Sequence, residues 1–160
     1  MAITGGVPMA HDVVFPNGAF IVGEVSAVED FKMAQAARES GSQMDTQARD
    51  KETGERIWQV RVIDGDEEAR RGQHEVTVKF VAPVQPIPPA TLPGLPFRPV
   101  EFVGLVGTPW VDTSRTMPRL MWSFRATDMR SPSRQTAGRS PASGANSAPP
   151  ATPAGEGKAA

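Results

Sequence analysis

Between residues 56 and 64, apolar side chains alternate with polar ones, and this pattern constrains the fold more than any other feature of the chain. A two-residue period is typical of a β-strand with one buried and one polar face. Residues 51–54 precede it as a tight loop, in which Gly54 is expected to take a positive φ. The pattern predicts an all-β module that binds a partner. The apolar positions are Trp58, Val60 and Val62, and the polar ones include Gln59 and Arg61.

Four further segments have strand character, at residues 19–28, 74–81, 100–106 and 119–127, and residues 47–50 form a candidate hairpin with 56–64. Residues 31–38 are rich in alanine, and both a partial helix and a long loop are consistent with them. Five or six strands without a strong amphipathic helix predict a small barrel or a sandwich. The favoured fold is a five-stranded barrel of the oligonucleotide-binding (OB-like) type, with the sandwich as the alternative.

Seven prolines lie between residues 83 and 99, where few residues can donate to a β-ladder. This segment, the proline connector, is predicted to be extended and polyproline-like. Two arrangements are open: it wraps the barrel and inserts Leu95 and Phe97 into the core, or it presents them to a partner protein. Wrapping is favoured because Phe97 leads directly into the strand that follows.

Composition divides the chain into a domain, residues 1–130, and a tail, residues 131–160. In the tail 22 of 30 residues are Ala, Ser, Pro or Gly, and none is aromatic, so we expect it to be disordered. The tail has three basic and one acidic side chain, which leaves 14 basic and 17 acidic ones in the domain. A domain of net charge −3 does not coat DNA by charge alone, so any nucleic-acid contact requires a local basic stripe.

No catalytic site is predicted. The chain has no cysteine, no phosphate-binding glycine loop and no nucleophile motif, and it has two distant histidines, His11 and His74, expected to be exposed or at strand edges. The acidic run 64–68 lacks calcium-binding spacing and predicts a solvated turn. We therefore expect a non-enzymatic protein without cofactor, metal or small-molecule substrate. Without an apolar run of about 18 residues or a signal peptide, the expected location is the cytoplasm, away from membranes.

The candidate nucleic-acid-binding residues combine one tryptophan with six basic side chains in or beside predicted strands. Proteins that bind single strands place aromatic faces beside Lys and Arg in a groove. Trp110 follows a proline near a predicted turn and is the best stacking candidate, although packing against the domain is equally open for it. Trp58 and Trp122 are expected in the core. The alternative is an ordinary charged sheet face. The basic candidates are Lys51, Arg56, Arg61, Lys79, Arg119 and Arg125, and Arg61 and Lys79 lie on polar faces of strands that could be neighbours.

Residues 12–25, 50–64, 92–102 and 124–130 together resemble the actinobacterial family of plasmid replication, integration and excision activators, encoded on integrative conjugative elements. The resemblance covers residues 12–130 and leaves out the tail. It implies a non-enzymatic accessory protein of an actinobacterial mobile element, which switches the integrated element toward excision, replication and transfer. It brings no catalytic residues.

Two molecular functions are consistent with these observations. In the first, the barrel holds single-stranded DNA, using Arg56, Arg61, Lys79 and Trp110. In the second, the protein is an adapter or regulator that contacts a replication initiator, a repressor or an excision protein of the same element through the proline connector or a sheet edge. The acidic domain favours the second, and the strand pattern favours the first.

Overall fold

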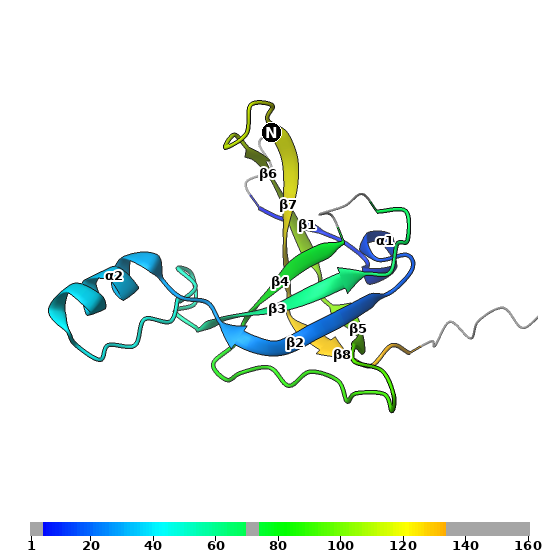
Figure 1. Ribbon diagram of the computed structural model, residues 1–160, viewed down its shortest axis with the longest axis horizontal. Coiled ribbons are helices and arrows are strands. Elements are labelled where there is room, and N and C mark those ends of the chain that lie inside the picture. The colour runs from blue at the N-terminus through cyan, green and yellow to red at the C-terminus, as the bar shows by residue number, and fades with distance from the viewer. Residues whose placement is uncertain (1–4, 70–73, 134–160) are drawn as a thin grey trace, which may run out of the picture.

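Eight strands form one curled sheet within the part of the chain that the computed structural model describes, residues 5–69 and 74–133 (Figure 1). The described residues are mostly β, in agreement with the predicted β-rich fold, and also include two short helices. The predicted number of five to six strands is too low, because two long segments are each divided by a bend and a short N-terminal strand is added. The strands are β1 (Val7–Pro8), β2 (Ala19–Ala27), β3 (Ile57–Asp64), β4 (Glu75–Val81), β5 (Arg98–Val103), β6 (Val106–Asp112), β7 (Arg119–Ala126) and β8 (Asp128–Arg130), and the helices are α1 (His11–Val14) and α2 (Phe31–Ser40).

The strand order is β1-β6-β7-β4-β3-β2-β5-β8. All neighbouring pairs are antiparallel except β4 and β7, which are parallel. Strand β6 pairs with β7, and β5, which precedes β6 in the chain, pairs with β8, which follows β7. The pair β6–β7 lies near one end of the strand order, and the pair β5–β8 lies at the other end. The segments β5–β6 and β7–β8 therefore bend at the same level, at Gly104 and Thr127, and the bend curls the sheet into a half-barrel.

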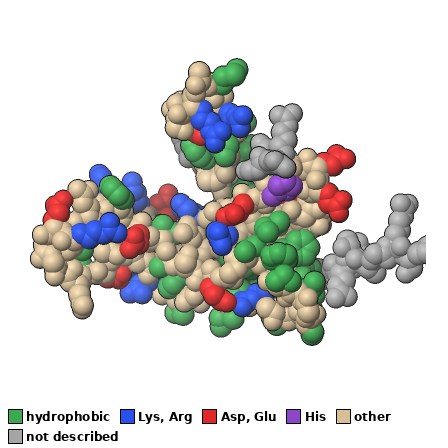
Figure 2. All heavy atoms as spheres, viewed as in Figure 1, with side chains coloured by type: hydrophobic (Ala, Val, Ile, Leu, Met, Phe, Trp, Pro, Cys, Tyr) green, Lys and Arg blue, Asp and Glu red, His purple; other side chains and the backbone are tan. Residues whose placement is uncertain are grey.

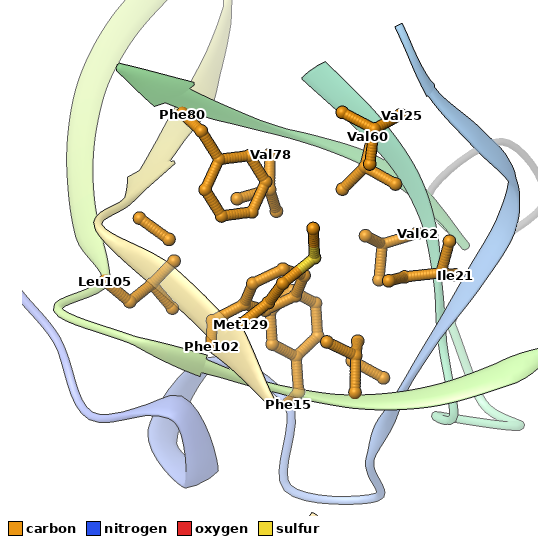
Figure 3. Packing of buried hydrophobic residues seen from close by; sticks show 13 residues of the cluster. Phe15, Ile21, Val25, Val60, Val62, Val78, Phe80, Phe102, Leu105 and Met129 are labelled. Carbon is orange, nitrogen blue, oxygen red and sulfur yellow. The ribbon is translucent and has the colours of Figure 1, made fainter. Parts of the chain in front are cut away.

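The concave side of the sheet holds the core (Figure 3). Val60 and Val62 of β3 meet Val78 and Phe80 of β4 there, and all four are almost fully buried, as the alternation predicted. Trp58 packs partly buried at the edge of this cluster, where its indole Nε1 donates a hydrogen bond to the Ala82 carbonyl at 3.0 Å. The remaining buried members come from β2, β5, β7, β8 and the connections: Phe15, Ala19, Ile21, Val25, Val100, Phe102, Leu105, Ala126 and Met129.

His11 contributes to this packing from α1, so the prediction of an exposed or strand-edge side chain is wrong. Its ring lies against Phe15 and Phe102, with centroid distances of 5.4 and 5.9 Å. Its Nδ1 accepts a hydrogen bond from the Phe102 backbone N–H at 3.1 Å. Burial lowers the pKa of His11, with Asp12 and Glu101 acting in the opposite direction. The His11 side chain therefore attaches α1 to β5 through ring packing and this hydrogen bond.

Segment 31–40 is helical, which decides between the two predicted alternatives. The carboxylate of Asp30 accepts hydrogen bonds from the backbone N–H groups of Lys32 and Met33 and so caps the first turn. Helix α2 buries only Ala34 and projects from the sheet as an arm (Figure 1). The turn before β3 also follows the prediction, since Gly54 has a φ of 73° and Arg49 bridges to Arg56.

The hairpin of β6 and β7 forms a second arm, and here the prediction of a core Trp122 is wrong. Strand β7 pairs with β4 only from Phe124 to Ala126, so the residues before Phe124 extend beyond the core. Trp122 is 40% exposed and Leu120 is 64% exposed. The alternation continues along β7, but before Phe124 the strand diverges from β4 and carries its apolar face away from the core.

The proline connector runs along the outside of the sheet, and its expected insertion into the core is also wrong. Leu95 and Phe97 are exposed. The connector is fixed instead by polar contacts, such as the Gln85 side-chain amide that donates to the Val25 carbonyl at 2.8 Å. From residue 134 on, the predicted disordered tail lies outside the described residues.

Candidate nucleic-acid interface

The convex face of the sheet carries a short polar row across three strands. In the β-ladder Gln59 of β3 lies beside Lys79 of β4, and Lys79 lies beside Arg125 of β7. Arg61 lies two residues further along β3, opposite Thr77. Since Val60, Val78 and Ala126 point into the core, the intervening side chains point outward. Three predicted basic residues, Arg61, Lys79 and Arg125, are therefore neighbours on one face.

The β6–β7 arm continues this face. Along β7, residues 119, 121, 123 and 125 share one side, and the register places Trp110 opposite Met121 and Asp112 opposite Arg119. Trp110 and Met121 are 47% and 40% exposed. Trp110 lies within strand β6, two residues before its end, and its exposure decides between the stacking and packing alternatives that the sequence left open. The strand rise places this Trp–Met pair about 13 Å from Arg125 along β7.

Ion pairs hold two of the basic side chains in the row. Arg125 Nη1 lies 3.1 Å from Asp50 Oδ1, and Arg61 Nη1 lies 3.6 Å from Glu75 Oε1. Hydrogen bonds from Thr53 and the nearby Arg125 lower the pKa of the Asp50 carboxyl. The turn that contains Gly54 therefore anchors the guanidinium of Arg125. Within the described residues Lys79 has no ion pair, which leaves its ammonium open to an incoming anion.

Arg56 and Lys51 lie apart from the row. Arg56 follows the alternation of the core-facing residues, and its guanidinium lies 3.1 Å from Asp45, whose carboxylate also binds Arg49. A hydrogen bond from the Gln47 backbone N–H, followed by the two arginines, lowers the pKa of Asp45. Arg56 thus belongs to an ion-pair network at the base of the α2 arm. Lys51 is exposed in the turn, next to Asp50.

Five of the seven predicted residues therefore share the convex face: Arg61, Lys79, Trp110, Arg119 and Arg125. The chemistry of this face suits a single nucleic-acid strand, since a base can stack on the indole while cations contact the backbone phosphates. Lys and Arg side chains are visible on the β6–β7 arm and near the middle of the sheet (Figure 2).

Sequence reasoning missed Asp50 and Met121 as members of this surface. Asp50 gave no signal because its partner Arg125 is 75 residues away in the chain. Met121 alternates with Trp122 in the last strand, but the pattern could not show which of the two would face outward together with Trp110. The β6–β7 register decides this.

Comparison with known proteins gives no match: no family model, no curated protein and no solved structure is similar to this chain. Within residues 5–69 and 74–133, no group of three or more His, Asp or Glu side chains is arranged so that it could hold a metal ion. No helix in the same part of the chain is long and apolar enough to cross a membrane.

Proposed function

We propose that the protein is a non-enzymatic single-stranded nucleic-acid-binding barrel, and that the strand lies along the convex face from Lys79 to Trp110. The observation that carries the proposal is the convergence of one exposed tryptophan and four basic side chains from four strands on that face. Exposed Trp110 and Met121 provide a stacking surface, and Lys79 and Arg125 provide cations beside it.

The strand pairing supports an OB-like barrel as the framework. In that fold the first strand pairs with the second and the fourth, and the third strand runs parallel to the fifth. Here β2 pairs with β3 and β5, and β4 runs parallel to β7. Taking β5–β6 and β7–β8 as the fourth and fifth strands gives the same scheme. OB-folds bind oligonucleotides on their second and third strands, which correspond to β3 and β4.

The biological setting that we propose follows from the family resemblance. The protein would act as an activator of replication, integration and excision of an actinobacterial mobile element, in the cytoplasm, where single strands arise during replication and transfer. A barrel that holds such strands needs no catalytic residues, in agreement with the absence of a catalytic motif in the sequence.

Fluorescence anisotropy with a labelled oligothymidine strand and a matching duplex tests the proposal. We expect the single strand to bind more tightly than the duplex, and Lys79→Ala and Trp110→Ala each to weaken it. Lys32→Ala, which removes an exposed cation from α2, is the matched control and should bind as the wild type does. Equal affinity for strand and duplex, or equal losses in Lys79→Ala and Lys32→Ala, would contradict the proposed face.

The second candidate function is the protein–protein adapter, and the exposure of the proline connector favours it. Val84 is 72% exposed and Ile87 is 86% exposed, so this extended segment offers apolar side chains to solvent. Extended proline-rich segments are common ligands of aromatic-lined grooves. Two results together would favour the adapter. The protein would not bind oligonucleotides at low salt, and it would bind the replication initiator of the same mobile element in a way that the double variant Val84→Ser/Ile87→Ser abolishes.

A further inference from the structure

A shallow apolar cavity of about 320 Å³ lies on the convex side of the sheet, at the opposite end of β3 from the α2 arm. Its apolar surface comes from three strands or their ends. Phe20 of β2 is the register partner of Ile63 of β3 and of Pro99 of β5, and Phe97 leads into β5. Phe97 is 39% exposed. We call this surface, formed by Phe20, Ile63 and Phe97, the apolar cup.

Carboxylates form one side of the cup. Asp64, Asp66 and Glu67 line it together with His74. One oxygen of Asp64 accepts a hydrogen bond from the Asp66 backbone N–H at 3.1 Å, and one oxygen of Asp66 accepts from the Glu68 N–H at 3.0 Å, so the turn itself orients the carboxylates. Within the described residues none of these three carboxylates has an ion pair. The sequence continues with Arg70 and Arg71, which lie outside the described residues.

We propose that the apolar cup is a docking site for a protein partner, which contributes a peptide segment with one large apolar or aromatic side chain beside Lys or Arg. The volume is at the lower end of the roughly 300–1,000 Å³ range of ligand pockets, and it suits a single anchoring side chain. Apolar anchors surrounded by polar rims are the usual centres of binding energy in protein interfaces. The carboxylate rim supplies charge complementarity to a cationic neighbour of that anchor.

The charge of the rim also distinguishes the cup from the nucleic-acid face. Carboxylates repel phosphates, so a nucleic-acid strand would stay on the basic part of the sheet, over β4, β7 and the arm. The cup lies over β5, β2 and the end of β3, and both surfaces are on the convex side. Hydrophobic side chains beside acidic ones and a histidine are visible on the face shown in Figure 2. Partner binding at the cup does not require nucleic-acid binding, and oligonucleotide binding to the basic face is measured separately by fluorescence anisotropy.

The probe for this site is a synthetic peptide, Gly-Lys-Arg-Trp-Lys-Leu-Arg-Gly, with a matched peptide in which Ala replaces Trp and Leu. Both are titrated into the full-length ¹⁵N-labelled protein and followed by two-dimensional NMR. We expect the first peptide to shift the amide signals of Phe20, Ile63 and Glu67, and the second to bind at least about fivefold more weakly. The variants Phe97→Ala and Glu67→Lys, both at exposed positions, should each weaken the first peptide by about fivefold or more.

The control variant is Glu39→Lys, which makes the same charge change on exposed α2 and should bind the peptide as the wild type does. Urea unfolding of each variant verifies that it is folded. No shifts at about 2 mM peptide, where a millimolar site would be more than half occupied, would overturn the proposal. Equal weakening in Glu67→Lys and Glu39→Lys would also overturn it, because binding would then follow net charge. Binding that does not change in Phe97→Ala would do the same.

Discussion

The bend that curls the sheet depends on one close contact between Gly104 and Thr127, and a pair of substitutions tests it. Gly104 has a φ of 61°, and a Cβ built on it would lie 2.4 Å from the Thr127 hydroxyl oxygen. The Gly104→Ala substitution therefore combines a left-handed backbone cost of about 1–2 kcal/mol with an overpacking cost of about 1–3 kcal/mol. We expect the free energy of unfolding to fall by about 2–5 kcal/mol in total.

Thr127→Ala separates the two costs. Alone, it removes the exposed hydrogen bond from the Thr127 hydroxyl to the Val103 carbonyl, a loss of about 0.5–1.5 kcal/mol. In the double variant the two closest Thr127 atoms are gone and the nearest remaining one, its Cβ, lies at 3.3 Å. The overpacking cost is then relieved and the backbone cost remains. The double variant should be more stable than the sum of the single effects by about 1–3 kcal/mol.

Urea unfolding of the four proteins, followed by tryptophan fluorescence, measures this coupling. The variants keep all three tryptophans, so the same probe reports on each of them. If the single effects add within about 0.5 kcal/mol, the two residues do not touch as described and the reasoning is wrong. A near-neutral Gly104→Ala would refute the left-handed bend itself.

Three further predictions concern the core, the acid range and the stacking residue. Phe80→Ala should lower the free energy of unfolding by about 3–5 kcal/mol, because Phe80 is 1% exposed. Leu120→Ala on the arm should change this free energy by less than about 1 kcal/mol. Similar urea midpoints for the two variants would contradict the separation of arm and core. Hydrogen bonds from Arg130 and Ser133 lower the pKa of Glu101 from 4.5 to about 2. The unfolded chain therefore binds more protons in this range, and the stability that Glu101 contributes above pH 4.5 should be lost as the pH falls through about 2. Urea midpoints between these pH values should depend less on pH in Glu101→Gln, and an unchanged slope would refute the assignment. Trp110→Ala should weaken binding of an oligothymidine strand by about 5- to 150-fold in anisotropy titrations, and an unchanged affinity would exclude stacking there.

Local alternation was enough to predict β3 and β4 with the correct buried faces. Val60, Val62, Val78 and Phe80 alternate with polar residues, and the continuous pairing of β3 with β4 places all four side chains on the same buried face. The same alternation in β7 predicted a core Trp122 wrongly. Burial there depends on where β7 pairs with β4: both strands begin before their pairing at Val78 and Phe124, and they diverge there. The place where two strands pair is not encoded in one strand's own pattern.

The other errors have similar causes. His11 is half-buried against the core because its ring lies against Phe15 and Phe102, and the second of these is 91 residues away. Phe97 stays on the surface because β2 and β3 present Phe20 and Ile63 on the convex side. The basic row was predictable in part, since Arg61 and Lys79 lie on the polar faces of predicted strands. That Trp110 and Arg119 lie on the same face could not be predicted, because it depends on the β6–β7 register.

The central claim is that a nucleic-acid strand binds the convex face through its cations, and the salt dependence of binding tests it most directly. The binding constant of an oligothymidine strand is measured at several salt concentrations for the wild type, Lys79→Ala and Lys32→Ala. With three or four phosphate contacts, log K should fall with a slope of about −2 to −3 against log salt, and Lys79→Ala should reduce the slope by about 0.7. A slope near zero, or an equal reduction in Lys79→Ala and Lys32→Ala, would contradict the claim.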